Sequence, residues 1–224
     1  PCTAKKYEIA RPELSRDGQK LVDYVLTTNE LASMIEEAGI RFQDLHSGSM
    51  DLPLGFSSGA GIVFGRAGGV SEAVARYASA EYRGGSAEAL DFAEEALGSG
   101  VRTASFEARG RRITVLSVQG LANAKRVARE ILAGTRKADL VEVMACPGGC
   151  IGGAGQPIAT DAASRSQRAA GLAQADGERE LRSTADNPFI ASFYSGTLGC
   201  RPGEGRAHEL VHTRYSSKKR IQDT

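Results

Sequence analysis

Two cysteines lie four residues apart in a glycine-rich stretch, and thiolates at that spacing can bind a metal ion or an iron–sulfur cluster. The stretch is "ACPGGCIGGAGQP", residues 145–157, with thiols at Cys146 and Cys150. Its glycines permit positive φ angles and a close approach of the backbone to a bulky group. Main-chain N–H groups in such a turn can also donate to thiolate or sulfide. The pattern favours a loop that closes around something large.

A zinc site suits these thiols less well than an iron–sulfur cluster does. Structural zinc sites use C-x2-C knuckles in pairs or add histidines, whereas this spacing is one residue longer and has no second pair. The three histidines, His46, His208 and His212, are distant in sequence. His208 and His212 are four residues apart and could form a ligand pair on a helix. Without a third ligand nearby, core packing or capping is the favoured use of that pair.

An iron–sulfur cluster is the better interpretation because the soft thiolates of Cys2, Cys146 and Cys150 could converge on one cluster. A cubane cluster generally takes four cysteines, and Cys200 is isolated enough to be expected as a buried or surface thiol. The ligand set is therefore one short. Since the chain also starts without methionine, we expect the missing cysteine upstream of Pro1.

Composition excludes several other classes of protein. The 224 residues allow one substantial domain or two small ones, and 28 basic against 27 acidic side chains leave a net charge of only +1. That balance argues against a dedicated nucleic-acid-binding protein. No apolar stretch approaches the ~20 residues of a membrane-spanning helix. Four cysteines are too few for a small disulfide scaffold, so intracellular metal binding is favoured.

The cysteine loop follows a predicted strand, residues 138–145, in a region where strands and helices alternate. Alternating apolar residues predict strands over 101–108 and 111–119, and helical spacing predicts a helix over 121–134. The fold class is therefore α/β. Elsewhere the patterns predict a helix over 20–38 that ends at Gly39, with a strand–helix break near Asn29 as an alternative, and a helix within 68–82 that opens with Ser71 as its N-cap. Two further helices are predicted over 86–98 and about 159–183, and short helices within 187–194 and 207–215. A loop is predicted over 45–61 and a short buried strand or turn over 61–65.

Four segments of this chain closely resemble conserved segments of the iron–iron (FeFe) hydrogenases, in the order found in that family. The two cysteine-bearing motifs carry most of the resemblance because they are long and chemically unusual. The four segments are "PCTAKKYEIARPE" (1–13), "GAGIVFGRAGGVSEAVAR" (59–76), "EVMACPGGCIGGAGQP" (142–157) and "NPFIASFYSGTLGCRPGEGRAHELVHTRY" (187–215).

The resemblance implies a partial FeFe-hydrogenase catalytic domain, with a mixed or parallel sheet flanked by helices and the cluster between two lobes. Residues 1–185 would form the cluster domain, truncated at its N-terminus, and residues 186–224 a small-subunit-like helical segment. The implied activity is reversible H2 oxidation and proton reduction. Because a first signature resembling T-S-C-C-P is absent from this sequence, we expect the chain to be inactive by itself.

The resemblance also implies roles for individual residues. In that family a 4Fe–4S cluster is bound by cysteines, one of which bridges to a two-iron subcluster carrying CO, cyanide and an aza-dithiolate. Motif matching makes Cys2, Cys146 and Cys150 cluster ligands and Cys150 the bridge. Lys5 matches a residue that contacts a cyanide, whose anionic character would offset the cost of a buried ammonium.

Three further positions match residues that surround the two-iron subcluster. Met144 matches a side chain beside it, and Phe64 and Gly65 match the wall opposite. Two acidic residues near Lys5, Glu8 and Glu13, are either supporting partners or ordinary surface acids, and the second reading is slightly favoured.

The partners implied by the resemblance are H2 and protons, ferredoxin or another redox protein, and hydrogenase maturation proteins, with no nucleic acid. The cytoplasm is the expected compartment, although periplasmic members exist. Two alternatives remain open. Hydrogenase-like iron–sulfur assembly factors share the fold but lack the two-iron subcluster, and sensory hydrogenase-like proteins use H2 to regulate a partner. The lysine in "PCTAKK" and the ending "GGAGQP" favour a hydrogenase over an assembly factor.

Overall fold

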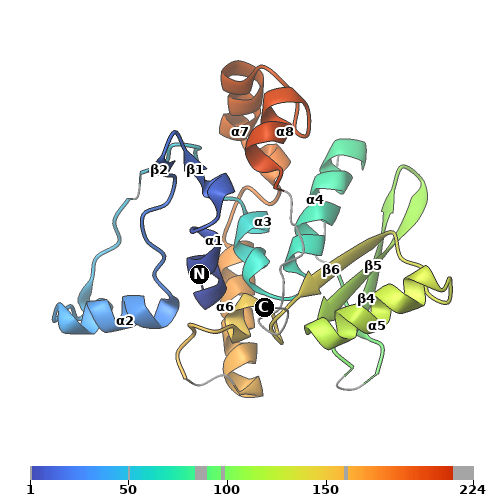
Figure 1. The fold of residues 1–224 in the computed structure, drawn as a ribbon, viewed down its shortest axis with the longest axis horizontal. Helices are drawn as coiled ribbons and strands as arrows, with labels where there is room; N and C mark the ends of the chain where they lie inside the picture. The colour runs from blue at the N-terminus through green and yellow to red at the C-terminus, as the bar shows by residue number, and fades with distance from the viewer. Residues whose placement is uncertain (1, 50, 84–89, 97–98, 159–160, 214–224) are drawn as a thin grey trace, which may run out of the picture.

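A mixed sheet flanked by helices forms the centre of the protein (Figure 1), which confirms the predicted α/β class. Its strands have the order β3-β4-β5-β6, with β3, β4 and β5 antiparallel and β6 parallel to β5. The strands are β3 (Ala93–Glu94), β4 (Val101–Ala108), β5 (Arg111–Gln119) and β6 (Leu140–Met144). This computed structural model describes residues 2–49, 51–83, 90–96, 99–158 and 161–213.

The β4–β5 hairpin has the predicted bounds, and the helix after it begins as predicted at Leu121 but ends two residues earlier, at Leu132. Arg109 and Gly110 join the two strands with φ angles of 51° and 71°, as a two-residue turn with positive φ at both positions requires. Helix α5 (Leu121–Leu132) connects β5 to the parallel strand β6. Gly134, with φ of 73°, follows the end of the helix.

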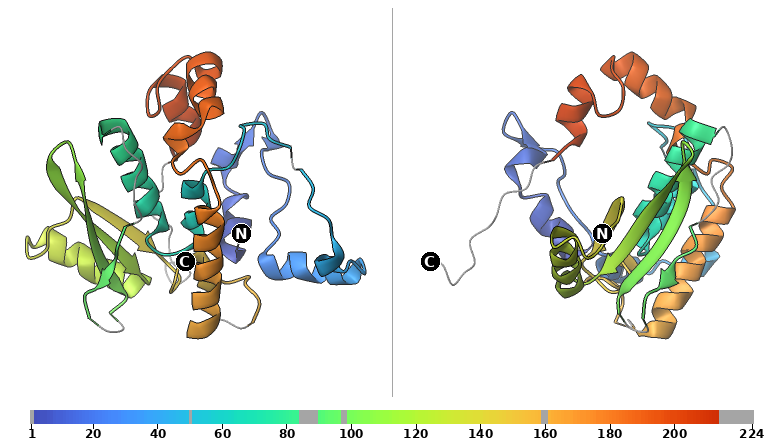
Figure 2. Two further views of the ribbon diagram at one scale, coloured as in Figure 1. Left: turned by 180° about the vertical axis from the view of Figure 1, so that it is seen from behind. Right: turned by 90° about the vertical axis from the view of Figure 1, so that its right-hand side faces the viewer.

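Helices cover both faces of the sheet. Figures 1 and 2 show α5 on one face and α4 (Gly69–Arg83) on the other. The α5 face forms the apolar core, where Val127 packs on buried strand residues. Those strand residues are Val101, Leu116 and Val118.

On the opposite face, a buried ion pair joins α4 to α6 (Ala162–Gly177). Arg76 Nη1 donates to Asp176 Oδ1 at 2.7 Å, and Arg76 also pairs with Glu72 one helical turn earlier. Hydrogen bonds from Arg76 hold the pKa of Asp176 below its usual value. Because both partners are almost fully buried, this contact fixes the two helices relative to each other.

The N-terminal segment, residues 2–49, has little regular structure and contains no buried apolar residue. Its longest helix, α2, begins after Thr27, whose side chain forms a capping box with Glu30. Lys6 also donates to Glu30, and these hydrogen bonds lower the pKa of Glu30 to about 2. The segment contains α1 (Thr3–Glu8), β1 (Ser15–Arg16), β2 (Gln19–Lys20), α2 (Thr28–Glu37) and 3-10 helices at Pro12–Leu14 and Phe42–Asp44.

Short helices complete the chain. A 3-10 helix at Thr184–Asp186 and α7 (Pro188–Ser192) lead through a π-helical turn, Phe193–Leu198, to α8 (Gly205–Val211). These agree with the short helices predicted within 187–194 and 207–215 as far as residue 213, beyond which the prediction lies outside the described residues. In the described part of the chain, we find no helix with the length and apolar character that crossing a membrane requires.

Several predicted elements differ from the structure. The helix predicted over 86–98 is wrong at residues 90–96, which contain β3, and its remainder lies outside the described residues. Ser71 is not an N-cap, because α4 already begins at Gly69. Three other predicted elements are shorter in the structure: the helix at 20–38 (now 28–37), the strand at 138–145 (now 140–144) and the helix at 159–183 (now 162–177, with 159–160 outside the described residues). The loop predicted over 45–61 contains the start of α3 (Gly59–Ile62). The end of α3 and a 3-10 helix, Val63–Gly65, also replace the strand or turn predicted over 61–65.

Candidate functional site

Strand β6 ends at Met144, and the cysteine loop follows it at the edge of the sheet. The backbone turns sharply between the thiols, where Gly149 N–H donates to the carbonyl of Cys146 at 3.1 Å. Gly148 and Gly149 have φ angles of 80° and 88°, a region that side chains rarely adopt. A single 3-10 turn, Cys150–Gly152, then follows. The predicted role of the glycines in the turn is therefore confirmed.

The close backbone approach predicted for this loop is made to the chain itself at Gly149. A Cβ atom there would lie 2.6 Å from the backbone nitrogen of Ala67. The same nitrogen donates to the carbonyl of Gly148 at 3.0 Å. The cysteine loop is thus pressed against the segment that follows Phe64 and Gly65, so the two sequence motifs lie side by side.

Two polar strand residues that the sequence did not single out hold these segments. Gln119 Oε1, at the end of β5, accepts from Gly148 N–H at 2.6 Å. The carboxylate of Glu142, 7% exposed, accepts from Gly68 N–H at 2.6 Å and Ser71 N–H at 2.9 Å. Gln119 and Glu142 belong to strands that were predicted from the sequence. An acidic residue within an otherwise apolar strand is the sequence signal that could have identified Glu142, because a buried carboxylate needs hydrogen-bond partners.

A cation completes this support. Arg102 of β4 donates to the carbonyl of Ala67 at 2.6 Å. Burial, followed by the nearby charge of Arg66, lowers the pKa of Arg102. Arg102 and Glu142 therefore hold the two sides of the turn that leads into α4, and this turn contacts the cysteine loop.

The N-terminal motif meets the cysteine loop from the other side. Thr3 N–H donates to the carbonyl of Ala154 at 3.2 Å, and Asn29 N–H donates to the carbonyl of Gly155 at 2.9 Å. A Cβ atom on Gly155 would lie 3.4 Å from Cα of Cys2. These bonds join residues 151 and 126 positions apart in the sequence, and Cys2 reaches the loop that carries Cys146 and Cys150.

The donor set suits an iron–sulfur cluster by its chemistry, although it is not a closed metal site. All four cysteines are free, with Cys150 exposed and Cys2 and Cys146 half-buried. Among the described residues, no three His, Cys, Asp or Glu side chains form a group that could hold a metal ion. The ligands are nevertheless soft thiolates, which fit an iron–sulfur cluster better than a hard cation. They lie on a glycine-rich loop in which Gly153 is beside the sulfur of Cys146.

The ammonium group of Lys5 is not buried, although the sequence led us to expect a buried one. Its side chain is 55% exposed, and Nζ lies 2.5 Å from a carboxylate oxygen of Glu8 in the next turn of α1. Glu8 is therefore a direct partner of Lys5 rather than an independent surface acid. Glu13 instead accepts from Arg11 at 2.9 Å.

The predicted wall residues lie on two sides of the cysteine loop and are not enclosed: Met144 ends the edge strand β6, and Phe64 and Gly65 belong to a 3-10 helix whose Gly65 carbonyl lies against Gly149. Met144 and Gly65 are half-buried, and Phe64 is 48% exposed. A Cβ atom on Gly65 would lie 2.9 Å from Leu172 of α6 and 4.0 Å from Ile151, which follows Cys150. The wall and the cysteine loop thus share contacts through Ile151.

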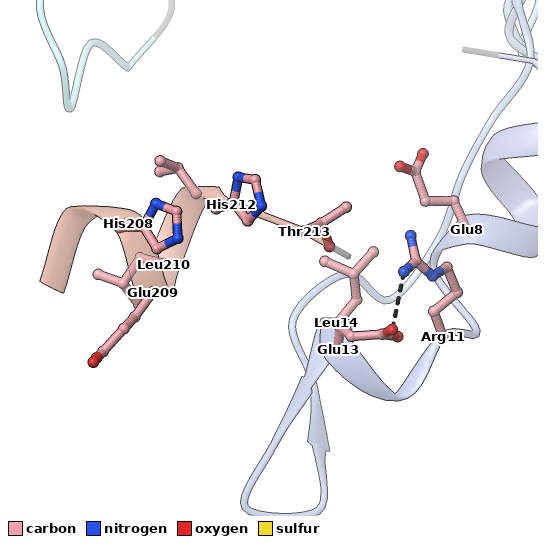
Figure 3. Close-up of a pocket in the computed structure, with 10 residues that line it drawn as sticks. Glu8, Arg11, Glu13, Leu14, His208, Glu209, Leu210, His212 and Thr213 are labelled. Carbon is pink, nitrogen blue, oxygen red and sulfur yellow. Dashed lines mark hydrogen bonds and ion pairs between the residues drawn. The ribbon is translucent and has the colours of Figure 1, made fainter. Parts of the chain in front are cut away.

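A cavity of about 660 Å³ lies beyond Glu8, between α1 and α8. Figure 3 shows two imidazoles on one side and the Arg11–Glu13 pair on the other. The rings of His208 and His212 stack, with centroids 4.4 Å apart and planes at 15°. Both histidines are exposed, so the core packing favoured from the sequence is wrong; the rings stack on each other, and His212 N–H donates to the carbonyl of His208 at 3.0 Å at the end of α8.

Cys200 lies apart from the other thiols. It lines a second cavity, of about 380 Å³, together with aromatic and apolar residues of α4 and the C-terminal helices. Tyr77 and Tyr194 are among them, and the other cysteines are not among the lining residues described for this cavity. The position agrees with the expected isolated thiol.

Two family models match the chain. The model "iron only hydrogenase large subunit, C-terminal domain" matches residues 1–154, and the model "iron hydrogenase small subunit" matches residues 162–218. The first match contains both cysteine-bearing motifs as far as Ala154 and covers more than half of the chain.

Individual relatives agree with the family models. The chain is 39% identical over 99% of its length to the NADP-reducing hydrogenase subunit HndD of Solidesulfovibrio fructosivorans, and 30% identical over 96% to Protein NAR1 of Arabidopsis thaliana. A solved structure of the [FeFe]-hydrogenase HydA1 from Chlamydomonas reinhardtii superposes with a TM-score of 0.79 and 34% identity over 96% of this chain. The chain spans 38%, 48% and 61% of these three proteins, respectively.

Proposed function

Since the chain belongs to the iron-only hydrogenase large-subunit family, we propose that it forms part of the catalytic region of an FeFe hydrogenase, which interconverts H2 with protons and electrons. The observation that carries this proposal is the meeting of the two cysteine motifs. Thr3 N–H donates to the carbonyl of Ala154, which places the "PCTAKK" segment against the loop of Cys146 and Cys150.

Three thiolates would hold the iron–sulfur cofactor. In the proposal, Cys2, Cys146 and Cys150 bind a 4Fe–4S cluster, and Cys150 bridges to a two-iron subcluster with CO, cyanide and aza-dithiolate ligands. The exposed thiol of Cys150 suits the bridging role because it is accessible to a second metal group. When bound, this cofactor supplies the redox chemistry of H2.

The protein's own share is positioning, charge and exclusion of water. Met144, at the end of β6, and Phe64, in the 3-10 helix whose Gly65 lies against the cysteine loop, would shield the two-iron subcluster from solvent. The ammonium of Lys5 has three donors, so it can keep its contact with Glu8 while donating to a cyanide nitrogen. A charge-assisted hydrogen bond of this kind orients the subcluster.

We further propose ferredoxin as the electron partner, maturation proteins as the source of the two-iron subcluster, and the cytoplasm as the compartment. The small-subunit family match at residues 162–218 supports a hydrogenase that works with redox partners. Residues 1–185 would form the cluster domain and 186–224 the small-subunit-like segment.

An iron–sulfur assembly factor is the second candidate. It is supported by the 30% identity to Protein NAR1 over 96% of the chain, and several relatives at 25–29% identity carry names of cytosolic iron–sulfur assembly proteins. The higher identity to HndD favours the hydrogenase. The two differ in chemistry, since an assembly factor needs no CO or cyanide ligands.

Replacement of the bridging thiol tests the hydrogenase proposal. The complete protein is produced without oxygen together with maturation proteins, and its H2 evolution from a reduced dye and its infrared bands for CO and cyanide are measured. Cys150→Ser should reduce both to background, because the bridge to the subcluster is lost. Cys200→Ser, which changes a thiol at the second cavity, is the matched control and should retain both.

The outcomes separate the candidate functions. A wild-type protein that binds iron and sulfide but shows neither infrared bands nor H2 evolution would contradict the hydrogenase and favour the assembly factor. Retention of the infrared bands in Cys150→Ser would contradict the bridging role of Cys150 specifically.

A further inference from the structure

The segment after Cys150 is held at both ends by one side chain of α6. Arg168 Nη1 donates to the carbonyl of Ile151 at 2.9 Å, and Nη2 donates to the carbonyl of Pro157 at 3.4 Å. We propose that Arg168 is a positioning residue, which sets the conformation of residues 151–157 and thereby the placement of the Cys150 thiol. This inference rests on the proposed function for the role of Cys150.

Residues 151–157 need an external constraint because this segment has few internal hydrogen bonds. It is "IGGAGQP", with three glycines, and its described regular structure is limited to the end of a 3-10 turn and an isolated bridge between Ala154 and Gln156. Glycine-rich backbone loses more conformational freedom on ordering than other backbone does. Two hydrogen bonds from one guanidinium tie its ends to a single rigid group.

The same segment, residues 151–157, accepts backbone hydrogen bonds from the N-terminal part of the chain. Ala154 accepts from Thr3, and Gly155 accepts from Asn29. Both acceptors lie between the two carbonyls that Arg168 holds. A change in the path of residues 151–157 would therefore displace Cys2 as well as Cys150.

Helix α6 is a suitable frame for this contact. Its N-terminus is capped by Asp161, which accepts from Ser164 N–H at 2.7 Å, and its C-terminal turn carries Asp176, paired with Arg76. One turn before Arg168, the aliphatic part of Arg165 lies against the loop, since a Cβ on Gly152 would be 2.8 Å from Arg165 Cδ. A Cβ on Gly148 would likewise be 3.1 Å from Arg165 Cδ, so successive turns of one helix support the loop before and after Cys150.

An arginine is required at this position for geometric reasons. The guanidinium is planar and presents separate N–H groups in a fixed fork, so it can hold two carbonyls at once. A lysine retains the charge but is a compact point donor and cannot reproduce both contacts.

Hydrogen–deuterium exchange on the complete, cluster-free protein tests the inference without requiring activity. Arg168→Met, which keeps an unbranched apolar side chain, should accelerate exchange of the amides in 151–157 about tenfold, and should leave exchange in β4 and β5 unchanged. Arg168→Lys should accelerate the same amides to a smaller extent. Arg179→Met, at an exposed arginine just after α6, is the control and should leave the segment unchanged.

Iron loading gives the functional readout. After anaerobic reconstitution with iron and sulfide, the iron content of Arg168→Met should fall several-fold relative to both the wild type and Arg179→Met. The reduction potential of the cluster that remains should become more negative, because a cation near the cluster stabilises its reduced form. A role in general stability alone would not confine faster exchange to 151–157 or shift the potential.

The inference is overturned if Arg168→Met folds and leaves both the exchange of 151–157 and the iron content unchanged. Should Arg168→Met fail to fold, Arg168→Lys decides by the same two measurements. Failure of the wild type to bind any cluster would contradict the proposed function, whereas the exchange experiment would still test the role of Arg168.

Discussion

At the scale of single residues, Lys5 is the side chain whose proposed role differs most from its surroundings. It is half-exposed and paired with Glu8, and a surface pair of this kind contributes only about 0–1 kcal/mol to stability. Lys5→Ala should therefore leave the fold intact. If Lys5 donates to a cyanide, the change should weaken retention of the two-iron subcluster about ten- to a hundredfold, as expected for one charge-assisted hydrogen bond.

The neighbouring lysine provides a matched control. Lys6 pairs with Glu30 at 2.8 Å, so Lys6→Ala removes the same charge from α1 without touching the proposed contact. Infrared intensity of the CO and cyanide bands per cluster is the measurement. Equal intensities in the two variants would contradict the role of Lys5.

Residue chemistry was predictable from the sequence where it depends on local conformation. Glycines at 148 and 149 were expected in a tight turn, and both have positive φ. Their neighbours were not predictable, because the contact of Gly149 with Ala67 joins segments that are distant in sequence. Gln119 was missed for the same reason, since nothing in a strand-ending glutamine indicates an acceptor for the loop.

At the scale of elements, Glu142 connects β6 to the start of α4. Its carboxylate accepts two backbone N–H groups, from Gly68 and Ser71, where the helix dipole also favours a negative charge. Glu142→Gln removes the charge and leaves a single acceptor oxygen, so we expect a loss of about 1–3 kcal/mol in the free energy of unfolding. Urea denaturation followed by circular dichroism measures it.

An exposed acid on the same sheet separates this effect from a general change of charge. Glu107→Gln on β4 should change the stability by no more than about 0.5 kcal/mol. Equal losses in the two variants would show that the capping interaction contributes nothing particular.

Elements with strong local patterns were predicted well, and one with a weaker pattern was not. Alternation in β4 and β5 agrees with their pairing along the whole hairpin. The helix expected over 86–98 fails where Ala93 and Glu94 pair with β4. Glu95, next in the chain, accepts from Thr103 and Arg136, so tertiary contacts override helix propensity there.

At the scale of the whole molecule, buried contacts are unevenly distributed. The apolar core lies between the sheet and α5, whereas α1 and α2 contain no buried residue. Many large apolar side chains before α3 are exposed, among them Tyr24, Phe42 and Phe56. Composition could not reveal this distribution, because it averages over both parts. The Arg76–Asp176 ion pair is one buried contact that links α4 to α6, which are distant in the sequence.

The pair between Arg76 and Asp176 should make global stability depend on acid pH. The pKa of Asp176 is lowered, chiefly by hydrogen bonds from Arg76. A carboxyl group with a lowered pKa in the folded state stabilises the fold above its unfolded pKa of about 3.9. That contribution is lost as the pH falls through the lower, folded pKa. Stability of the wild type should therefore decrease below about pH 4.

Asp176→Asn tests this dependence because an amide cannot ionise. The variant should lose about 1–3 kcal/mol near neutral pH, since the charge-assisted hydrogen bonds from Arg76 to residue 176 are weakened while Glu72 still pairs with Arg76, and its stability should fall less steeply below about pH 4. Asp44→Asn, which breaks the exposed Arg41–Asp44 pair, should cost about 0–1 kcal/mol and keep the wild-type pH profile. Urea midpoints measured across the acid range distinguish the two. An unchanged acid slope in Asp176→Asn would mean that other carboxylates, such as that of Glu30 with its pKa of about 2, set the acid limit of the fold.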